Sequence, residues 1–140
     1  MVKGVIFDMD GTMFDTERLS TKGWMYAGEK LGVELPRSLV DAFRGTNPTA
    51  IRNKFTEYFG DRLDYDKTRA VKHEYFEMAT KDGIPLEEGL VELLEYLNAN
   101  GIPAAVATST EQKRAEMIIK KAGVYEMFTG YTYGLSLIHI

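Results

Sequence analysis

The chain has 140 residues, of which 44% are hydrophobic, and it contains no cysteine. These values fit one ordinary globular domain and exclude general disorder, a disulfide framework and a thiolate metal site. The 17 Lys and Arg side chains against 21 Asp and Glu give a net charge of −4, which argues against nucleic-acid or anionic-membrane binding. No apolar run approaches membrane-spanning length, so we expect a cytoplasmic protein, and nothing predicts a protein partner.

The first predicted element is a strand at residues 5–7, where three apolar residues precede an acidic turn. Such a run is typical of a strand buried on both faces of a parallel sheet. Four helices are then predicted up to residue 83, each with a glycine after its last turn. Their apolar stripes are Trp24, Ala27, Gly28 and Leu31; Leu39, Val40 and Phe43; Ile51, Phe55, Tyr58 and Phe59; and Val71, Tyr75, Met78 and Ala79.

After Pro85 the pattern alternates between helix and strand. A helix ending near Gly101 precedes an apolar strand at residues 104–107, and a helix ending near Gly123 precedes a third candidate strand at residues 131–133. This alternation is typical of a parallel α/β sheet. The helix stripes are Leu90, Leu93, Leu94 and Leu97, then Ala115, Ile118, Ile119 and Ala122.

Polar residues follow the first two apolar strands. Asp8 and Asp10 come directly after the first strand, where two neighbouring carboxylates suit Mg²⁺, and Gly11 allows a tight turn. Thr108 ends the second strand, so it should lie at the same edge of the sheet. Ser109 and Gln112 have the spacing of a capping box, and the N-terminus of the helix they would open is a suitable phosphate site. A solvated turn for the Asp pair and a simple cap for Thr108 are the alternative interpretations.

At these residues the chain resembles the haloacid dehalogenase superfamily, in its β-phosphoglucomutase-like branch of phosphatases and mutases. "FDMDGT" resembles the first family motif, D-x-D-G-T, and "VATST" resembles the second, a strand that ends in Thr or Ser. The resemblance covers residues 1–134. It implies an α/β fold: a partial Rossmann-like parallel sheet core in residues 1–13 and 84–134, with an inserted four-helix cap in residues 14–83.

The same resemblance implies a Mg²⁺-dependent phosphatase that acts on a small phosphorylated metabolite. Asp8 would attack phosphorus and form an aspartyl-phosphate, and Asp10 would protonate the leaving oxygen and then activate water. Asp8 and Asp10 would hold Mg²⁺, Asp10 through its backbone carbonyl. Thr108, Ser109 and Gly11 would bind the phosphoryl oxygens, and the cap would select the substrate.

A sugar phosphomutase and a phospho-accepting receiver-like domain are the alternatives to the phosphatase. Sugar phosphomutases of this branch carry a His on the first cap helix at the position where Ser20 stands, and their Arg and Ser after a glycine are replaced here by Asn47 and Pro48. Both departures favour a phosphatase. A phospho-accepting receiver-like domain would need its acceptor Asp after a third strand near mid-chain, where this sequence predicts helices.

The last six residues, "LSLIHI" at 135–140, depart from the family pattern at Leu135, where an Asp is expected. The codons CTG TCT CTT ATA CAC ATC would encode them and resemble a transposon-end adaptor used in sequencing libraries. We therefore expect residues 135–140 to be a non-native tail and the 140-residue chain to be a C-terminally truncated, inactive fragment. A genuine short apolar tail is the alternative.

Overall fold

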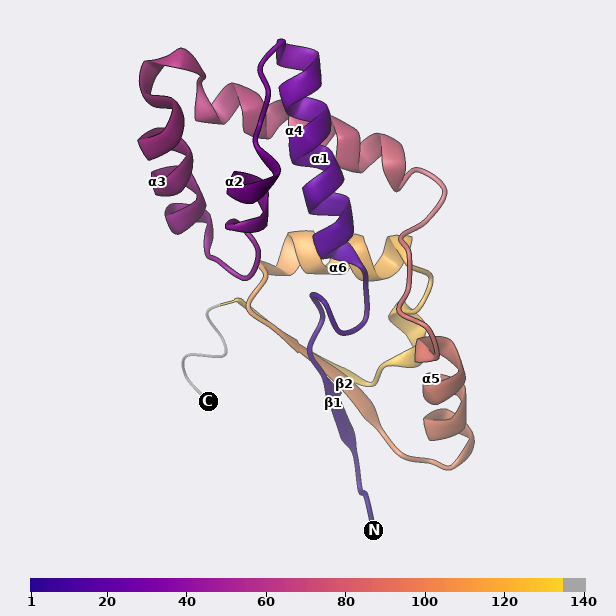
Figure 1. Cartoon of the computed structure of the whole chain (residues 1–140). Coiled ribbons are helices and arrows are strands. Elements are labelled where there is room, and N and C mark those ends of the chain that lie inside the picture. The colour runs from indigo at the N-terminus through magenta and orange to yellow at the C-terminus, as the bar shows by residue number, and fades with distance from the viewer. Residues whose placement is uncertain (135–140) are drawn as a thin grey trace. The chain divides into compact units, whose positions relative to one another are not determined.

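The computed structural model describes residues 1–134, so the expected tail at 135–140 lies outside the described residues. The chain forms two compact units. One comprises Met1–Thr16 and the chain from Asp82 onward, and the other is Glu17–Lys81. Figure 1 shows the elements of both units. Within residues 1–134, no helix combines the length and apolar character needed to cross a bilayer.

Within residues 1–134, the sheet of the first unit has three parallel strands in the order β1-β2-β3, namely Val5–Phe7, Ala104–Thr108 and Gly130–Tyr133. This confirms the predicted α/β class with a parallel sheet. Phe7 pairs with Val106, and both side chains are buried. Phe128 packs edge-on against Phe7, with ring centroids 5.7 Å apart.

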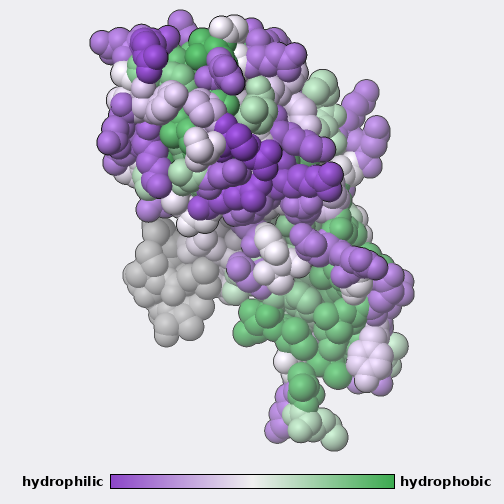
Figure 2. All heavy atoms as spheres, viewed as in Figure 1, coloured by the Kyte–Doolittle hydropathy of each residue, from purple (hydrophilic) through white to green (hydrophobic). Residues whose placement is uncertain are grey.

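The prediction that the first strand is buried on both faces is wrong for Ile6, which is 73% exposed. Side chains alternate along a strand, so Ile6 faces away from the side that buries Phe7. That opposite face is open to solvent at Ile6 within residues 1–134, and Figure 2 shows apolar surface gathered over the strands of this unit.

Two helices follow the predicted pattern in the first unit. Helix α5 spans Leu90–Ala99 and α6 spans Gln112–Lys121, with a short 3₁₀ turn, η2, at Tyr125–Met127. Their buried residues are Leu90, Leu94 and Leu97 in α5, and Ala115, Ile118 and Ile119 in α6. Leu93, predicted in the α5 stripe, is 44% exposed, because it lies at the margin of the buried face.

The second unit is helical. Its elements are α1 (Thr16–Leu31, whose first residue belongs to the sheet unit), α2 (Arg37–Asp41), α3 (Pro48–Phe59), the 3₁₀ turn η1 (Gly60–Arg62) and α4 (Tyr65–Ala79). Trp24 is 2% exposed and lies at the centre of its core, with ring centroids 5.2 Å from Phe43 and 6.0 Å from Phe55. The other buried members of this core are Leu35, Val40, Phe59 and Tyr65.

Helix α1 makes a close approach to the loop that follows it. A methyl group placed on Gly28 would lie 2.7 Å from the carbonyl oxygen of Val33 and 2.7 Å from Cδ1 of Leu35. Only a residue without Cβ allows the chain to pass this closely. Gly28 therefore lets the loop fold back onto α1.

The side chains of Asn47 and Asp64 cap the N-termini of α3 and α4, the last two α-helices of the helical unit. Asn47 accepts from Ala50 N–H at 2.8 Å and Asp64 accepts from Lys67 N–H at 2.8 Å, so each caps its helix N-terminus.

The apolar stripe predicted for α4 is wrong in part. Met78 is 58% exposed, whereas Phe76 is buried, so the inward face is rotated relative to the predicted one.

Candidate functional site

The loop after β1 alternates buried and exposed side chains. Met9 and Met13 are fully buried, while Asp8 and Asp10 are exposed. The loop is closed by Met13 N–H donating to Met9 O at 3.0 Å and by Glu87 N–H donating to Met13 O at 2.9 Å. The buried methionines thus anchor the loop and direct both carboxylates outward.

Gly11 makes the turn between Asp10 and the buried part of the loop. Its φ is +74°, and its N–H donates to Phe14 O at 3.2 Å. A methyl group at Gly11 would meet nothing within 4 Å, so the residue is needed for its backbone conformation and not for space. Its predicted contact with a phosphoryl group stays a prediction.

Thr108 ends β2 and is 1% exposed. Its hydroxyl oxygen accepts a hydrogen bond of 3.1 Å from Thr110 N–H, which closes a tight turn around the exposed Ser109. Because this turn occupies residues 108–110, α6 begins only at Gln112, with Glu111 as its N-cap residue and no side-chain cap. The predicted capping box of Ser109 and Gln112 is therefore wrong.

Asp10 joins the ends of the first two strands. Its Oδ2 accepts a hydrogen bond of 2.9 Å from the hydroxyl of Thr110, and its Oδ1 accepts one of 3.2 Å from the hydroxyl of Thr16. The structure thus brings the loop of Asp10 next to the loop after Thr108. This is expected, because the carboxyl ends of neighbouring parallel strands lie at the same edge of the sheet. Sequence reasoning missed Thr110 and Thr16. The run "TST" at 108–110 was the available signal for Thr110.

The end of β3 lies beside the turn at Thr108 and Thr110. Gly134 N–H donates to Thr110 O at 2.9 Å, and Tyr133 pairs with Thr108 across the sheet. Burial raises the pKa of Tyr133 to about 12, and the nearby Glu116 carboxylate adds to the shift. Tyr133 is therefore neutral at physiological pH.

Asp8 has a simpler environment. Its Oδ1 accepts from its neighbour Met9 N–H at 2.9 Å. Within residues 1–134, neither Asp8 nor Asp10 forms an ion pair. Asp8 is an exposed carboxylate held at the carboxyl end of β1, and such a group is available for attack on an electrophile.

Comparison with known proteins decides the family. Residues 5–134 match the family of haloacid dehalogenase-like hydrolases. The chain belongs to this family. Hexitol phosphatase A of Escherichia coli is 28% identical over 123 residues, which are 87% of this chain and 55% of that protein. A phosphorylated carbohydrates phosphatase of Thermotoga maritima is 24% identical over 133 residues, or 95% of this chain and 62% of the relative.

The fold is also shared with solved structures. A Thermotoga maritima protein described as a proposed β-phosphoglucomutase superposes with a TM-score of 0.81 at 24% identity, covering 96% of this chain and 62% of its own. This likeness concerns the fold alone. The chain thus spans between half and two thirds of the length of these relatives.

The oxygen atoms at the end of β1 show whether this haloacid dehalogenase-like hydrolase has ligands of the type that the predicted Mg²⁺ requires. Carboxylate and carbonyl oxygens at the end of β1 are the hard donors that Mg²⁺ prefers, so Asp8 and Asp10 fit the ion by type. Both carboxylate oxygens of Asp10 already accept hydrogen bonds, so the carboxylate of Asp8 is the freer of the two, and the expected ligand from Asp10 is its backbone carbonyl. The part of the chain that the structure describes contains no cluster of three metal-ligating His, Cys, Asp or Glu side chains.

Proposed function

We propose that the whole protein is a Mg²⁺-dependent phosphatase that hydrolyses a small phosphate ester through an aspartyl-phosphate on Asp8. The observation that carries the proposal is the hydrogen bond of 2.9 Å between Asp10 and Thr110, which joins the loop of the two carboxylates to the loop after Thr108. The membership in a hydrolase family and the phosphatases among its relatives support the same reaction.

In the first half of the proposed reaction, a carboxylate oxygen of Asp8 attacks phosphorus. The bond from phosphorus to the ester oxygen breaks, and Asp10 gives its proton to that oxygen, so the alcohol leaves and Asp8 carries the phosphoryl group. In the second half, Asp10 takes a proton from water, whose oxygen attacks phosphorus. Inorganic phosphate leaves, and Asp8 is again a carboxylate.

Thr108, Ser109 and Gly11 are the proposed phosphoryl-binding groups. The hydroxyl oxygen of Thr108 accepts from Thr110 N–H, and its own proton forms no hydrogen bond within the described residues. That proton is therefore suited to a phosphoryl oxygen. Ser109 is exposed and would contribute its backbone N–H beside it.

Mg²⁺ would be held by Asp8 and by Asp10 through its backbone carbonyl. When bound, the ion would offset the negative charge of the carboxylates and the phosphate. At this site, residues 1–134 supply the carboxylates of Asp8 and Asp10, and neither of them forms an ion pair with a cation of the described residues. We therefore propose that the site is incomplete in the 140-residue chain and that this chain, purified with Mg²⁺, releases no phosphate above background.

The substrate class proposed is a small phosphorylated metabolite. Two relatives act, by their names, on hexitol phosphates and phosphorylated carbohydrates. Hydrolysis is favoured over sugar-phosphate isomerisation because Ser20, on α1, stands where the mutases carry an imidazole. A receiver-like function is disfavoured because the middle of the chain is helical, from Pro48–Phe59 to Tyr65–Ala79. The helical unit is proposed to be the cap that selects the substrate.

Trapping the intermediate tests the proposed chemistry directly. The whole protein is mixed with a phosphate ester and Mg²⁺, quenched in acid and reduced with borohydride, which converts an aspartyl-phosphate to homoserine. We expect mass spectrometry to place homoserine at position 8. Homoserine at another position, or an unmodified chain during steady turnover, would contradict the assignment.

A further inference from the structure

We propose that Thr110 positions the Asp10 carboxyl group for proton transfer, an inference that rests on the proposed phosphatase activity. Thr110 lies 100 positions from Asp10 in the sequence, and its hydroxyl donates to Asp10 Oδ2 at 2.9 Å. It is a positioning residue, since it would act on the substrate only through Asp10.

The backbone of Thr110 is held at the end of its own strand, β2, and by the residue that follows β3. Its N–H donates to the hydroxyl of Thr108 at 3.1 Å, and its carbonyl accepts from Gly134 N–H at 2.9 Å. With Asp10, Thr110 thus contacts the loops that follow all three described strands. These two backbone bonds fix the direction in which the Thr110 side chain leaves the chain, and that side chain reaches Asp10.

The geometry of the Asp10 carboxylate depends on both of its hydrogen bonds. Rotation of an Asp carboxylate about χ2 has broad energy wells, so a single bond leaves its plane poorly defined. Thr16 holds Oδ1 at 3.2 Å and Thr110 holds Oδ2 at the shorter 2.9 Å, so together they fix the plane. Loss of the Thr110 hydroxyl would leave only the longer bond.

A hydroxyl is suited to this position because it both donates and accepts. Asp10 must be ionised in one half of the proposed reaction and protonated in the other. Thr110 can donate to the ionised carboxylate and accept from the protonated one, whereas a Lys ammonium or a backbone N–H can only donate. The same residue therefore supports Asp10 in both protonation states.

The test uses the dependence of the reaction on its leaving group. In the whole protein, Thr110→Val removes the hydroxyl while keeping the shape of the side chain. An alkyl phosphate needs a proton on its leaving oxygen, and 2,4-dinitrophenyl phosphate does not. We expect kcat/KM for the alkyl phosphate to fall by about 10- to 100-fold, part of the usual worth of a positioned proton donor, and that for the dinitrophenyl ester to change by less than about threefold. The ratio kcat/KM is used because it covers the steps up to loss of the alcohol.

Three variants serve as controls, and a fourth is held in reserve. Thr110→Ser keeps the hydroxyl and should restore alkyl-phosphate turnover. Thr132→Val, on β3, is a matched loss of a hydroxyl elsewhere in the sheet and should leave both ratios unchanged. In an Asp10→Asn background, Thr110→Val should cause no further loss, because the two residues act as a unit. Thr110→Ala replaces Thr110→Val if the latter fails to fold.

Equal losses on both substrates, or no loss on either, would overturn the positioning role. Asp8→Asn is measured alongside on the same two substrates. If Asp8→Asn keeps its activity, the proposed function itself fails. If Asp8→Asn abolishes turnover while Thr110→Val has no selective effect, only the role of Thr110 fails.

Discussion

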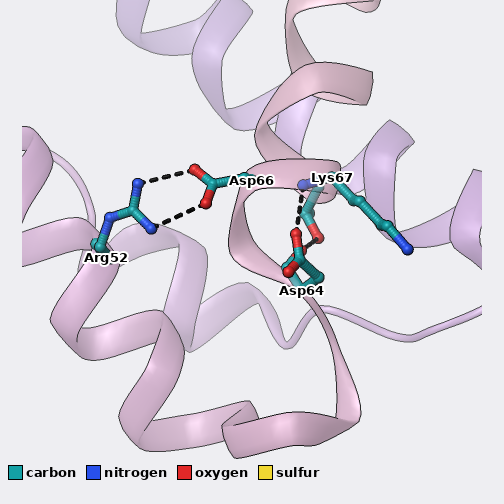
Figure 3. A network of polar contacts seen from close by, with 5 residues as sticks. Arg52, Asp64, Asp66 and Lys67 are labelled. Atoms are coloured by element: carbon teal, nitrogen blue, oxygen red, sulfur yellow. Dashed lines mark hydrogen bonds and ion pairs between the residues drawn. The ribbon is translucent and has the colours of Figure 1, made fainter.

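Arg52 of α3 and Asp66 of α4 are joined by two hydrogen bonds, of 3.1 and 2.8 Å, from the two terminal nitrogens of the guanidinium to the two carboxylate oxygens. Figure 3 shows this paired geometry beside the Asp64 cap of α4. The guanidinium also lies over the ring of Tyr65, 4.4 Å from its centroid. The pair therefore links α3 to α4 at the surface of the helical unit.

This ion pair predicts a pH dependence of stability. The hydrogen bond from Arg52 lowers the pKa of Asp66 below its ordinary value of 3.8. A carboxyl whose folded pKa is depressed stabilises the fold above its unfolded pKa, and this contribution is lost as the pH falls through the folded pKa. Asp66→Asn should therefore lower the Tm slightly at pH 7 and have progressively less effect below pH ~4.

Thermal unfolding of the 140-residue chain between pH 7 and pH 3 measures this effect. Asp61→Asn, in the same helical unit, is the control for loss of one exposed negative charge. The ion pair would not contribute to stability if Asp66→Asn lowered the Tm equally at pH 7 and pH 3. The same conclusion would follow if its effect were no larger than that of Asp61→Asn.

The close approach at Gly28 predicts that Gly28→Ala destabilises the helical unit. The added methyl group would lie 2.7 Å from a backbone carbonyl, so the loop at Val33 must move. Overpacking costs about 1–3 kcal/mol, which outweighs the gain of up to ~1 kcal/mol in helix propensity. Urea unfolding measures the difference. Glu29→Ala, an exposed position of the same helix, should be neutral or slightly stabilising, and a stabilising Gly28→Ala would contradict the contact.

Substitution of the two carboxylates separates their proposed roles in the whole protein. Asp8→Asn should abolish release of phosphate, because an amide does not attack phosphorus. Asp10→Asn should slow it by roughly 10²–10⁴-fold, the usual worth of a positioned acid or base. Asp82→Asn is the exposed control. Phosphate release is followed in steady state with Mg²⁺, and an Asp8→Asn variant that keeps most of its activity would refute the nucleophile.

Ser20 predicts hydrolysis as the outcome with a sugar phosphate. A hydroxyl does not provide the imidazole that the mutases place at this position. Incubation of the whole protein with β-glucose 1-phosphate should release inorganic phosphate, followed by ³¹P NMR. Accumulation of glucose 6-phosphate without net release of phosphate would favour the mutase. The variant Ser20→His introduces the imidazole and tests whether that residue alone shifts the products from inorganic phosphate to glucose 6-phosphate.

The open face at Ile6 predicts that the 140-residue chain associates with itself. Ile6 is 73% exposed on β1, an edge strand of the described sheet, and apolar edge strands promote association. Ile6→Lys should lower the sedimentation coefficient or the fraction that aggregates. Met78→Lys is the matched control, since Met78 is 58% exposed but lies on α4. A chain that is monomeric at every concentration tested would contradict the prediction.

Local patterns in the sequence predicted the scaffold of the site well. The apolar strands and the acidic turn placed Asp8 and Thr108 at strand ends, because a short apolar run bounded by polar residues is a local signal. The bond from Thr110 to Asp10 could not be predicted in this way, because it depends on the register of β1 and β2 and on the turn that closes at Thr108.

Errors in the helices have a similar cause. Helix α4 carries many charged side chains, so apolar residues fall on more than one side, and the predicted stripe included Met78 while it omitted Phe76. Which side faces inward depends on packing with distant parts of the chain: Tyr65, at the start of α4, joins the core of Trp24, whose other members lie outside α4. Periodicity gives the presence of a helix more reliably than the direction of its buried face.

In the sequence, the helical unit is inserted between β1 and β2, and this insertion has a consequence for the order of folding. β1 and β2 must find each other across the whole helical unit, as Asp10 and Thr110 do across 100 positions. Closing so long a loop carries a large entropic cost, whereas the helices of residues 17–81 form mainly local contacts. If the helical unit folds first, much of the chain between β1 and β2 is already ordered, so less conformational entropy remains to be lost when the two strands pair. We therefore expect substitutions in the Trp24 core to slow formation of the β1–β2 pair, although none of those residues belongs to the sheet.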